Sequence, residues 1–309
     1  MKPGAQAAPV SPAAGWDSTS VRPTSRVADF IALTKPRLNL LVLVTTLAGL
    51  YLAEPEGVAL PVLLHTMLGT ALVAGGAAAF NQAWEQHTDS LMTRTRARPV
   101  PAGRLRAAQA IWFALAMSGA GLADLALGVA LLPAAVAALT LITYVLIYTP
   151  LKRRTSLATL VGAVPGALPP VIGWTAAGGG LTLPAAVLFG IVFLWQMPHF
   201  LAIAWLYRDE YRAAGIPLLP VLEPDGLRTG RQTLLYSAAL WPVSLMPTLL
   251  GLAGGFYIAL ATLLGGTLMA LSAQFARERS TEAARQLFLF SIIYLPLLLG
   301  ALVADRLWI

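Results

Sequence analysis

Apolar stretches about as long as a bilayer is thick recur along the whole chain, and they constrain its fold more than any other feature. They occupy residues 38–53, 59–80, 107–128, 131–149, 157–177, 183–206, 233–250, 254–275 and 284–304. A helix needs about 20 apolar residues to cross the hydrocarbon layer, and inside that layer only a helix or a closed barrel satisfies its own backbone. The sequence therefore predicts an all-α, polytopic membrane protein with nine transmembrane helices. Because the first stretch is short, we expect its helix to begin near Ile31.

The remaining composition agrees with this class and removes several kinds of chemistry. The chain contains no cysteine, which excludes disulfides, thiolate metal sites and a cysteine nucleophile. Residues 1–29 are rich in Pro, Ala, Ser and Thr and lack an apolar core of signal-peptide length. We expect a disordered cytosolic tail there and one nine-helix transmembrane domain over residues 30–309.

The basic residues of the loops test this helix count independently, because cytoplasmic loops retain Lys and Arg. With a cytoplasmic N-terminus, the inner side collects the tail and residues 94–106, 152–154, 208–231 and 277–285. Of the 21 basic residues, only Arg306 then lies outside. The pattern predicts a multi-pass protein of the inner (plasma) membrane with an outer C-terminus. The net charge of +7 indicates this topology and contact with anionic membrane lipid, not nucleic-acid binding.

A polar island, NQAWEQHTD, interrupts the chain where the second apolar stretch ends. Residues four apart on a helix drift by only about 40° per step, so Asn81, Glu85 and Asp89 would line one face over two turns. Loosely spaced oxygen ligands suit Mg²⁺, which completes its shell with water and substrate phosphates. The sequence predicts a metal-binding face here. The alternative is a solvated helix end with acidic decoration.

Arginines follow these acids directly, at positions 94, 96, 98, 104 and 106. Carboxylates for a metal beside guanidinium groups for phosphate oxygens are what a Mg-diphosphate requires. We expect Arg94 and Arg98 to clamp phosphate, although a cytoplasmic loop is also expected to be basic.

Two further segments on the inner side also contain charged residues. Asp209 and Glu210 follow the sixth apolar stretch, beside Tyr207, and could form a second acidic site. Lys152 and Arg153 follow the fourth stretch and add cations from the same side. Each could instead be ordinary juxtamembrane charge.

Taken together, these stretches resemble the UbiA superfamily of intramembrane prenyltransferases, from about Thr34 to Asp305. The matching segments are residues 34–37, 81–98, 148–155, 166–174, 195–200 and 214–220. The chain departs from the superfamily pattern twice. Glu85 replaces the usual Asp in the first motif, and the second motif offers only Asp209 and the adjacent Glu210 in place of two Asp four residues apart.

The resemblance implies helices around a central cavity, Mg²⁺ as cofactor and a prenyl diphosphate as substrate. Within the superfamily the chain is most similar, through its residues 195–200 and 214–217, to members that transfer a farnesyl group from farnesyl diphosphate to heme B. It then implies Asn81, Glu85, Asp89 and Asp209 as metal ligands, with Glu210 joining them as catalytic residues. A downstream heme-modifying enzyme or a terminal oxidase is the expected partner.

Several side chains are candidates for binding these substrates. They are Arg94, Arg98, Lys152, Arg153, Tyr148, Tyr207, Trp195, Gln196, His199 and His87. Aromatic faces can stabilise a cation, and heme iron commonly accepts a histidine ligand. His199 and Gln196 lie inside the apolar layer, where polar groups usually face a cavity. The alternatives are ordinary packing for the aromatic residues, a helix–helix hydrogen bond for His199 and a plain surface position for His87.

Two other functions compete with this one. A UbiA-type enzyme could prenylate an aromatic acid or a quinone precursor instead of heme. A multi-pass transporter belongs to a different class, but transporters tend to place charged residues near the bilayer midplane. The apolar stretches here contain almost none, so the sequence favours an enzyme with a site at one membrane face.

Overall fold

The computed structural model describes residues 25–307, and within them every regular element is a helix. Nearly all of the expected disordered tail lies outside these residues. Its last four residues, 26–29, belong instead to helix α1 (Arg26–Leu33), whose N-terminus is capped by the hydroxyl of Ser25. Asp29 is buried in this helix, so the folded domain begins before the predicted boundary.

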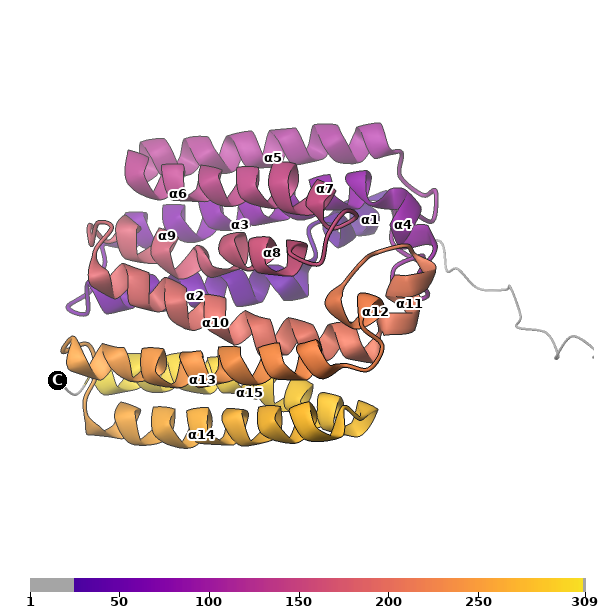
Figure 1. The fold of residues 1–309 in the computed structure, drawn as a ribbon. Coiled ribbons are helices and arrows are strands. Elements are labelled where there is room, and N and C mark those ends of the chain that lie inside the picture. The colour runs from indigo at the N-terminus through magenta and orange to yellow at the C-terminus, as the bar shows by residue number, and fades with distance from the viewer. Residues whose placement is uncertain (1–24, 308–309) are drawn as a thin grey trace, which may run out of the picture.

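Nine helical segments run the length of the described bundle (Figure 1). They are α2 (Pro36–Ala53), α3 (Leu60–Trp84), α5 (Ala107–Gly128), α6 (Leu131–Ile142) continued by η1 (Thr143–Tyr148) and α7 (Thr149–Leu151), α8 (Ala158–Ala167) with α9 (Pro169–Ala176), α10 (Leu183–Leu206), α13 (Leu227–Leu249), α14 (Gly255–Glu278) and α15 (Thr281–Arg306). Eight of the segments are long and apolar enough to cross a membrane. The exception is α13, which has 23 residues and is the least apolar of the long helices. The predicted all-α membrane fold is confirmed. Nine segments are long enough to span a membrane, but only eight of them are also apolar enough, so the predicted count of nine is not fully confirmed.

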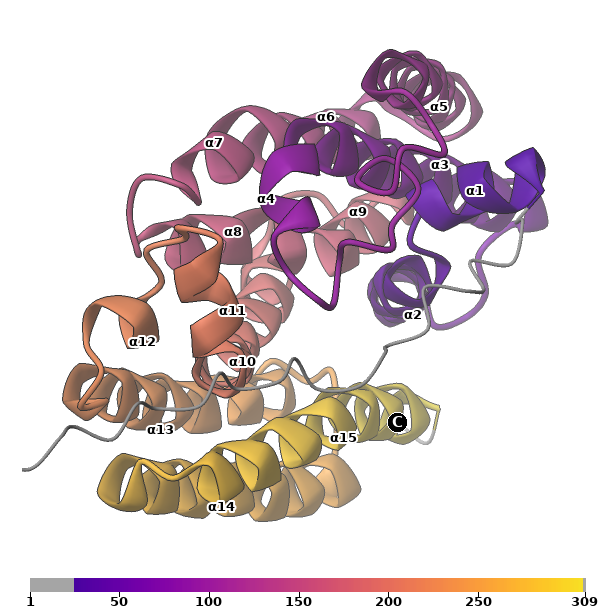
Figure 2. The ribbon, with the colours of Figure 1, turned by 90° about the vertical axis from the view of Figure 1, so that its right-hand side faces the viewer.

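Four short elements lie together at one end of the bundle, which we call the loop end: α1, α4 (Gln86–Ser90), α11 (Arg208–Ala213) and α12 (Leu219–Leu222). Figure 2 looks onto this end and shows α4 and α11 over the middle of the bundle. The last turn of α15 lies at the opposite end (Figure 1). The two acidic segments therefore come to the same end of the protein, as the sequence predicts.

The first transmembrane helix begins later than predicted. Helix α1 ends at Leu33, Lys35 adopts a left-handed conformation with φ of 49°, and α2 starts at Pro36. A residue that precedes proline is disfavoured in the right-handed helical region, and proline is favoured in the first turn of a helix. The chain therefore breaks before Pro36, and this break turns Lys35 toward the loop end.

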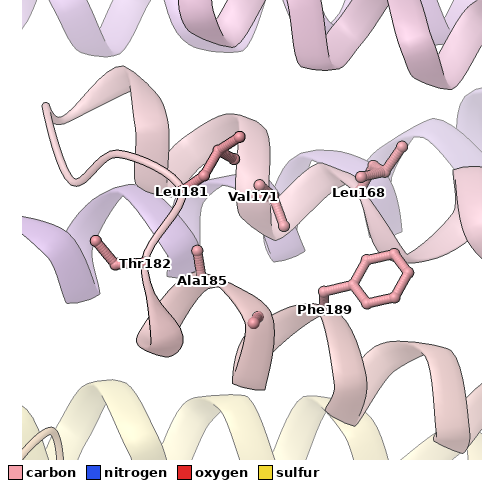
Figure 3. A pocket seen from close by; sticks show the side chains of 7 residues that line it. Leu168, Val171, Leu181, Thr182, Ala185 and Phe189 are labelled. Carbon is pink, nitrogen blue, oxygen red and sulfur yellow. The ribbon is translucent and has the colours of Figure 1, made fainter.

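The remote half of the bundle is tightly packed and apolar. A side chain at Gly49 of α2 would overlap the carbonyl of Pro170, and one at Gly173 of α9 would overlap the carbonyl of Thr46. Small residues permit this close approach of helices in lipid. Nearby, an apolar pocket of about 250 Å³ opens between α9 and α10 (Figure 3). Its lining includes Phe189 but none of the predicted site residues, so it is separate from the acidic segments.

Candidate active site

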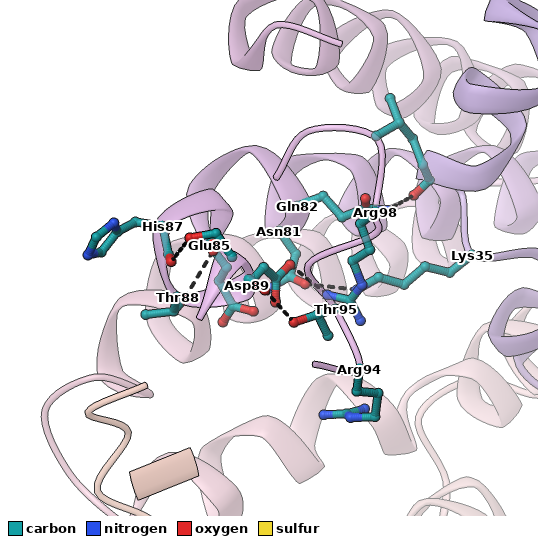
Figure 4. A network of polar contacts seen from close by, with 12 residues as sticks. Lys35, Asn81, Gln82, Glu85, His87, Thr88, Asp89, Arg94, Thr95 and Arg98 are labelled. Carbon is teal, nitrogen blue, oxygen red and sulfur yellow. Dashed lines mark hydrogen bonds and ion pairs between the residues drawn. The ribbon is translucent and has the colours of Figure 1, made fainter. Parts of the chain in front are cut away.

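The first acidic segment is buried at the loop end. Asn81, Glu85 and Asp89 are only 3%, 5% and 1% exposed, which excludes the solvated helix end as an explanation. The predicted single helix through all three is wrong, because α3 ends at Trp84 and α4 begins at Gln86. The spacing survives this break, since Glu85 N donates to Asn81 O at 2.9 Å and Asp89 N donates to Glu85 O at 2.8 Å. The three side chains accordingly gather on one side (Figure 4).

Each of the two carboxylates faces one cation. Lys152 Nζ lies 3.0 Å from Glu85 Oε1, and Arg98 donates to Asp89 Oδ2 at 2.7 Å. The loss of hydration by itself lowers the pKa of Lys152, but the carboxylate of Glu85 and nearby tyrosines outweigh it and raise that pKa. Both cations come from the segments that the sequence proposed as phosphate clamps.

A third cation, Lys35, was not predicted as a site residue. Its Nζ donates to Asn81 Oδ1 at 2.8 Å, and Asn81 in turn donates to Thr149 Oγ1 at 3.4 Å. Loss of hydration, followed by the positive charge of Arg98, lowers the pKa of Lys35 to about 7. We call the following six residues the paired cluster: Lys35, Asn81, Glu85, Asp89, Arg98 and Lys152.

The cluster contains oxygen atoms that suit a hard divalent cation. Asp89 Oδ1 is buried and has no hydrogen-bond partner, and an orphaned buried carboxylate oxygen is costly unless something compensates it. Mg²⁺ prefers carboxylate and amide oxygens. Within residues 25–307 no three carboxylate, imidazole or thiolate groups converge on one point, so the donor set is limited to two carboxylates and one amide.

The second acidic segment is not part of this cluster. Asp209 in α11 has a side chain that is 78% exposed, and its partner is Arg212 in the same helix at 2.8 Å. Glu210 Oε2 accepts from the backbone N–H of Arg94 at 3.3 Å. The structure therefore brings the segment after α4, which contains Arg94, into contact with α11. It does not place Asp209 beside Asp89 as a metal ligand.

Arg94 connects the segment after α4 to the second acidic segment through its side chain. Its guanidinium lies over the rings of Tyr207 and Tyr211, at 5.3 and 5.9 Å from their centroids, and donates to the Tyr211 hydroxyl at 3.1 Å. Below it, Met92 and Ile216 pack in one apolar cluster with Tyr211. Tyr211 was missed in the sequence, and Arg94 contacts aromatic rings where a phosphate contact was expected.

The aromatic residues on the far side of Lys152 pack tightly. Tyr148 lies 5.4 Å from Tyr144 between ring centroids, and a side chain at Gly162 would overlap the Tyr148 ring. Arg153, by contrast, is exposed. The structure thus keeps Tyr148 next to the cluster and directs Arg153 away from the protein interior.

Two of the three candidate residues on α10 face α15, and the third faces α8. Trp195 Nε1 donates to the carbonyl of Ser291 in α15 at 2.7 Å, and His199 Nδ1 is 2.8 Å from the Ser291 hydroxyl. Gln196 points to α8, where it donates to Ala163 O at 3.3 Å. His199 therefore makes the helix–helix hydrogen bond that was the alternative to heme binding. His87 is exposed and points away from the cluster (Figure 4).

Comparison with known proteins places this geometry in a family. The pattern of the UbiA prenyltransferase family matches residues 42–294. The chain belongs to this family. It is 48% identical to a protoheme IX farnesyltransferase of Solibacter usitatus over 287 residues, which are 90% of this chain and 98% of that protein. It is also 49% identical to a protoheme IX farnesyltransferase of Myxococcus xanthus over 280 residues, with 90% and 95% covered.

Solved UbiA-type structures share the fold. A digeranylgeranylglyceryl phosphate synthase superposes with a TM-score of 0.79 and 15% identity, over 93% of this chain and 100% of that one. A UbiA homolog from Archaeoglobus fulgidus bound to GPP and Mg²⁺ gives a TM-score of 0.65 and 14% identity, over 90% and 99%. At these identities the likeness shows a UbiA fold and nothing about substrate.

Proposed function

We propose that this chain transfers the farnesyl group of farnesyl diphosphate to a vinyl group of heme B, with addition of water, to give heme O and diphosphate. The observation that carries the proposal is the match to proteins named protoheme IX farnesyltransferase, at 48% and 49% identity over nearly their whole length. The buried, cation-rich cluster supplies the chemistry that such a transfer needs.

Departure of the diphosphate is the step that the paired cluster supports. The allylic carbon–oxygen bond breaks when the negative charge that develops on the leaving oxygens is stabilised in a site of low dielectric constant. Lys152 and Arg98 are already fixed there by Glu85 and Asp89. Their ammonium and guanidinium groups can bind phosphate oxygens, so no general acid has to protonate the leaving group.

The same site fits a magnesium ion. We propose that Asn81, Glu85 and Asp89 hold it, and the buried, unpartnered Oδ1 of Asp89 supports this donor set. When bound, Mg²⁺ supplies Lewis-acid neutralisation of the diphosphate. Asp209 is excluded from our ligand set because its side chain is exposed and paired within α11.

Carbon–carbon bond formation then requires protection of a carbocation. The farnesyl cation adds to the vinyl group of heme, and water captures the resulting cation beside the porphyrin with release of a proton. The ring of Tyr148 lies near Lys152, and the ring of Tyr144 lies 5.4 Å from that of Tyr148 between centroids. Both rings can stabilise the positive charge. Placement of heme iron on His199 stays a prediction: Nδ1 is engaged with Ser291, which leaves Nε2 as the candidate ligand atom.

The proposed cellular setting follows from the charges and the substrates. The eight apolar helices establish a multi-pass membrane protein. We propose that the loop end faces the cytoplasm of the plasma membrane, because the basic loops gather there. Heme O made in this membrane would pass to a downstream heme-modifying enzyme or to a terminal oxidase.

A direct test uses purified protein in lipid nanodiscs with heme B, farnesyl diphosphate and Mg²⁺, followed by mass spectrometry of extracted hemes. We expect a porphyrin heavier by one hydroxyfarnesyl addition. A parallel incubation with aromatic acids and quinone precursors tests the other UbiA chemistry. A prenylated aromatic acid without any modified heme would overturn the proposal.

A further inference from the structure

Lys35 differs from the other two cations of the paired cluster in what it faces. Lys152 and Arg98 are each paired with a carboxylate, whereas the ammonium of Lys35 donates to the uncharged amide oxygen of Asn81 at 2.8 Å (Figure 4). Among the ion pairs of residues 25–307, none includes Lys35. Its charge is therefore not neutralised by direct contact with an acid.

Lys35 is also fixed in place and does not act as a loose interfacial anchor. Its backbone is left-handed, with φ of 49°, a conformation that a residue other than glycine adopts at a cost. The preceding helix α1 is tied to the bundle because Gln82 donates to Leu33 O at 3.0 Å and Arg104 donates to Asp29 at 2.9 Å. These contacts hold the Lys35 side chain over Asn81.

The charges of the paired cluster do not balance. Glu85 and Asp89 supply two negative charges, whereas Arg98, Lys152 and, in its protonated form, Lys35 supply three positive ones. A divalent cation that entered alone would meet this excess positive charge at short range, where the repulsion is strong. A divalent cation that entered with a multiply charged diphosphate would leave the site close to neutral.

We propose that Lys35 occupies the amide-oxygen position of the metal site until a diphosphate binds, and thereby makes divalent-cation binding depend on diphosphate. Asn81 becomes available to the cation when the anion compensates the charge of Lys35. This inference rests on the proposed function, because it assumes that Asn81, Glu85 and Asp89 form the metal site. It adds a residue that sets the order of binding and protects the cluster from metal without substrate.

The test measures metal binding and not turnover. Full-length protein in nanodiscs, in slightly acidic buffer that keeps the ammonium charged, is titrated with Mn²⁺ and followed by electron paramagnetic resonance, with and without inorganic diphosphate. For the native protein we expect diphosphate to tighten Mn²⁺ binding at least about tenfold, after correction for Mn²⁺–diphosphate in protein-free buffer. In Lys35→Met we expect Mn²⁺ alone to bind about tenfold tighter, with a smaller gain from diphosphate.

Two further variants keep the test decisive. Lys35→Gln keeps an N–H donor for Asn81, which supports folding where the methionine variant folds poorly. Because it also removes the charge that repels a lone divalent cation, it should shift both titrations in the same direction as Lys35→Met does. Arg37→Met removes an exposed cation two residues away and should leave both titrations unchanged.

The outcomes separate the two proposals. Unchanged or weaker binding of Mn²⁺ alone in both Lys35 variants, with the diphosphate effect intact, overturns the role of Lys35 and leaves the metal site standing. Absence of Mn²⁺ binding to the native protein under either condition overturns both.

Discussion

The two acidic segments at the loop end contain similar residues but meet different environments. Asp89 is 1% exposed and paired with Arg98 from a loop that folds back over it. Asp209 has a side chain that is 78% exposed and paired with Arg212 one turn away. A solvent-exposed pair is screened and contributes little, whereas charges in a water-poor site interact strongly. We therefore assign stabilisation of a departing diphosphate to the first segment.

The difference originates in what precedes each segment. Helix α3 runs through the interior between α2 and α5, and more than half of its residues from Thr66 onward are buried. Because Glu85 directly follows this buried helix, its side chain is buried as well. Helix α11 follows α10 at the surface and buries only Tyr211 among its six residues. The second segment contacts the segment after α4 through Arg94.

The largest expected effect separates the two aspartates directly. Asp89→Asn should reduce heme O formation by about a thousandfold, because it removes a charged metal ligand from a buried site. Asp209→Asn should retain activity within about threefold, since it breaks only an exposed pair. Mass spectrometry of hemes from membranes with matched protein levels measures both. Equal loss in the two variants would place the second segment in the active site and contradict the comparison.

Magnesium dependence tests the same contrast, and a smaller effect is expected when a single ligand is changed. Removal of divalent cations with a chelator should abolish activity, and Mg²⁺ should restore it. Glu85→Gln should raise the Mg²⁺ concentration for half-maximal activity by about tenfold, because one charged ligand is lost. Asp209→Asn serves as the control and should show the native Mg²⁺ curve. A native curve for Glu85→Gln together with a shifted one for Asp209→Asn would reverse our ligand assignment.

The link between the segments is expected to matter less. Arg94→Lys keeps the charge but loses the planar group that covers Tyr207 and donates to Tyr211. We expect a loss of about 1 kcal/mol in docking, seen as a several-fold lower kcat/KM and faster proteolysis within the loop after α4. Arg96→Lys, at an exposed position of the same loop, is the matched control. Unchanged proteolysis in Arg94→Lys would show that the two loops do not depend on this contact.

Much of the fold could be predicted because the apolar stretches are long and the bilayer permits few alternatives. The i, i+4 spacing of Asn81, Glu85 and Asp89 also predicted that the three would gather on one side. The interruption at Glu85 could not be predicted, because Trp84, Glu85 and Gln86 include no proline or glycine. Hydrogen bonds across the break keep the four-residue spacing. The three side chains therefore still lie on one side, although the helix is interrupted.

The residues that were missed depend on tertiary contacts. Lys35 before an apolar helix is typical of an interfacial anchor, and only the α1–α2 break brings it to Asn81. Pro36 was the one available signal for that break. Asp209 and Asp89 could not be told apart from sequence, because exposure is set by the packing of α3 and α11 and not by local composition. His199 and Gln196 lie about one turn apart on the same helix, yet they face different neighbours.

A further expected effect concerns the pH dependence of stability, and it contrasts Lys35 with the exposed cations of the same end. Its pKa is about 7 in the folded protein, below the value of about 10.4 for an unfolded chain. Between these values the unfolded chain binds the extra proton, so stability rises with pH. Below pH 7 both states are protonated, and the cost of enclosing the charge is fully present.

We expect the free energy of unfolding to rise by up to about 1 kcal/mol per pH unit, or ~2 °C in Tm, between pH 7 and pH 9. The rise should disappear in Lys35→Met and persist in Arg37→Met, measured by thermal unfolding in detergent; an equal rise in all three proteins would assign it to other groups.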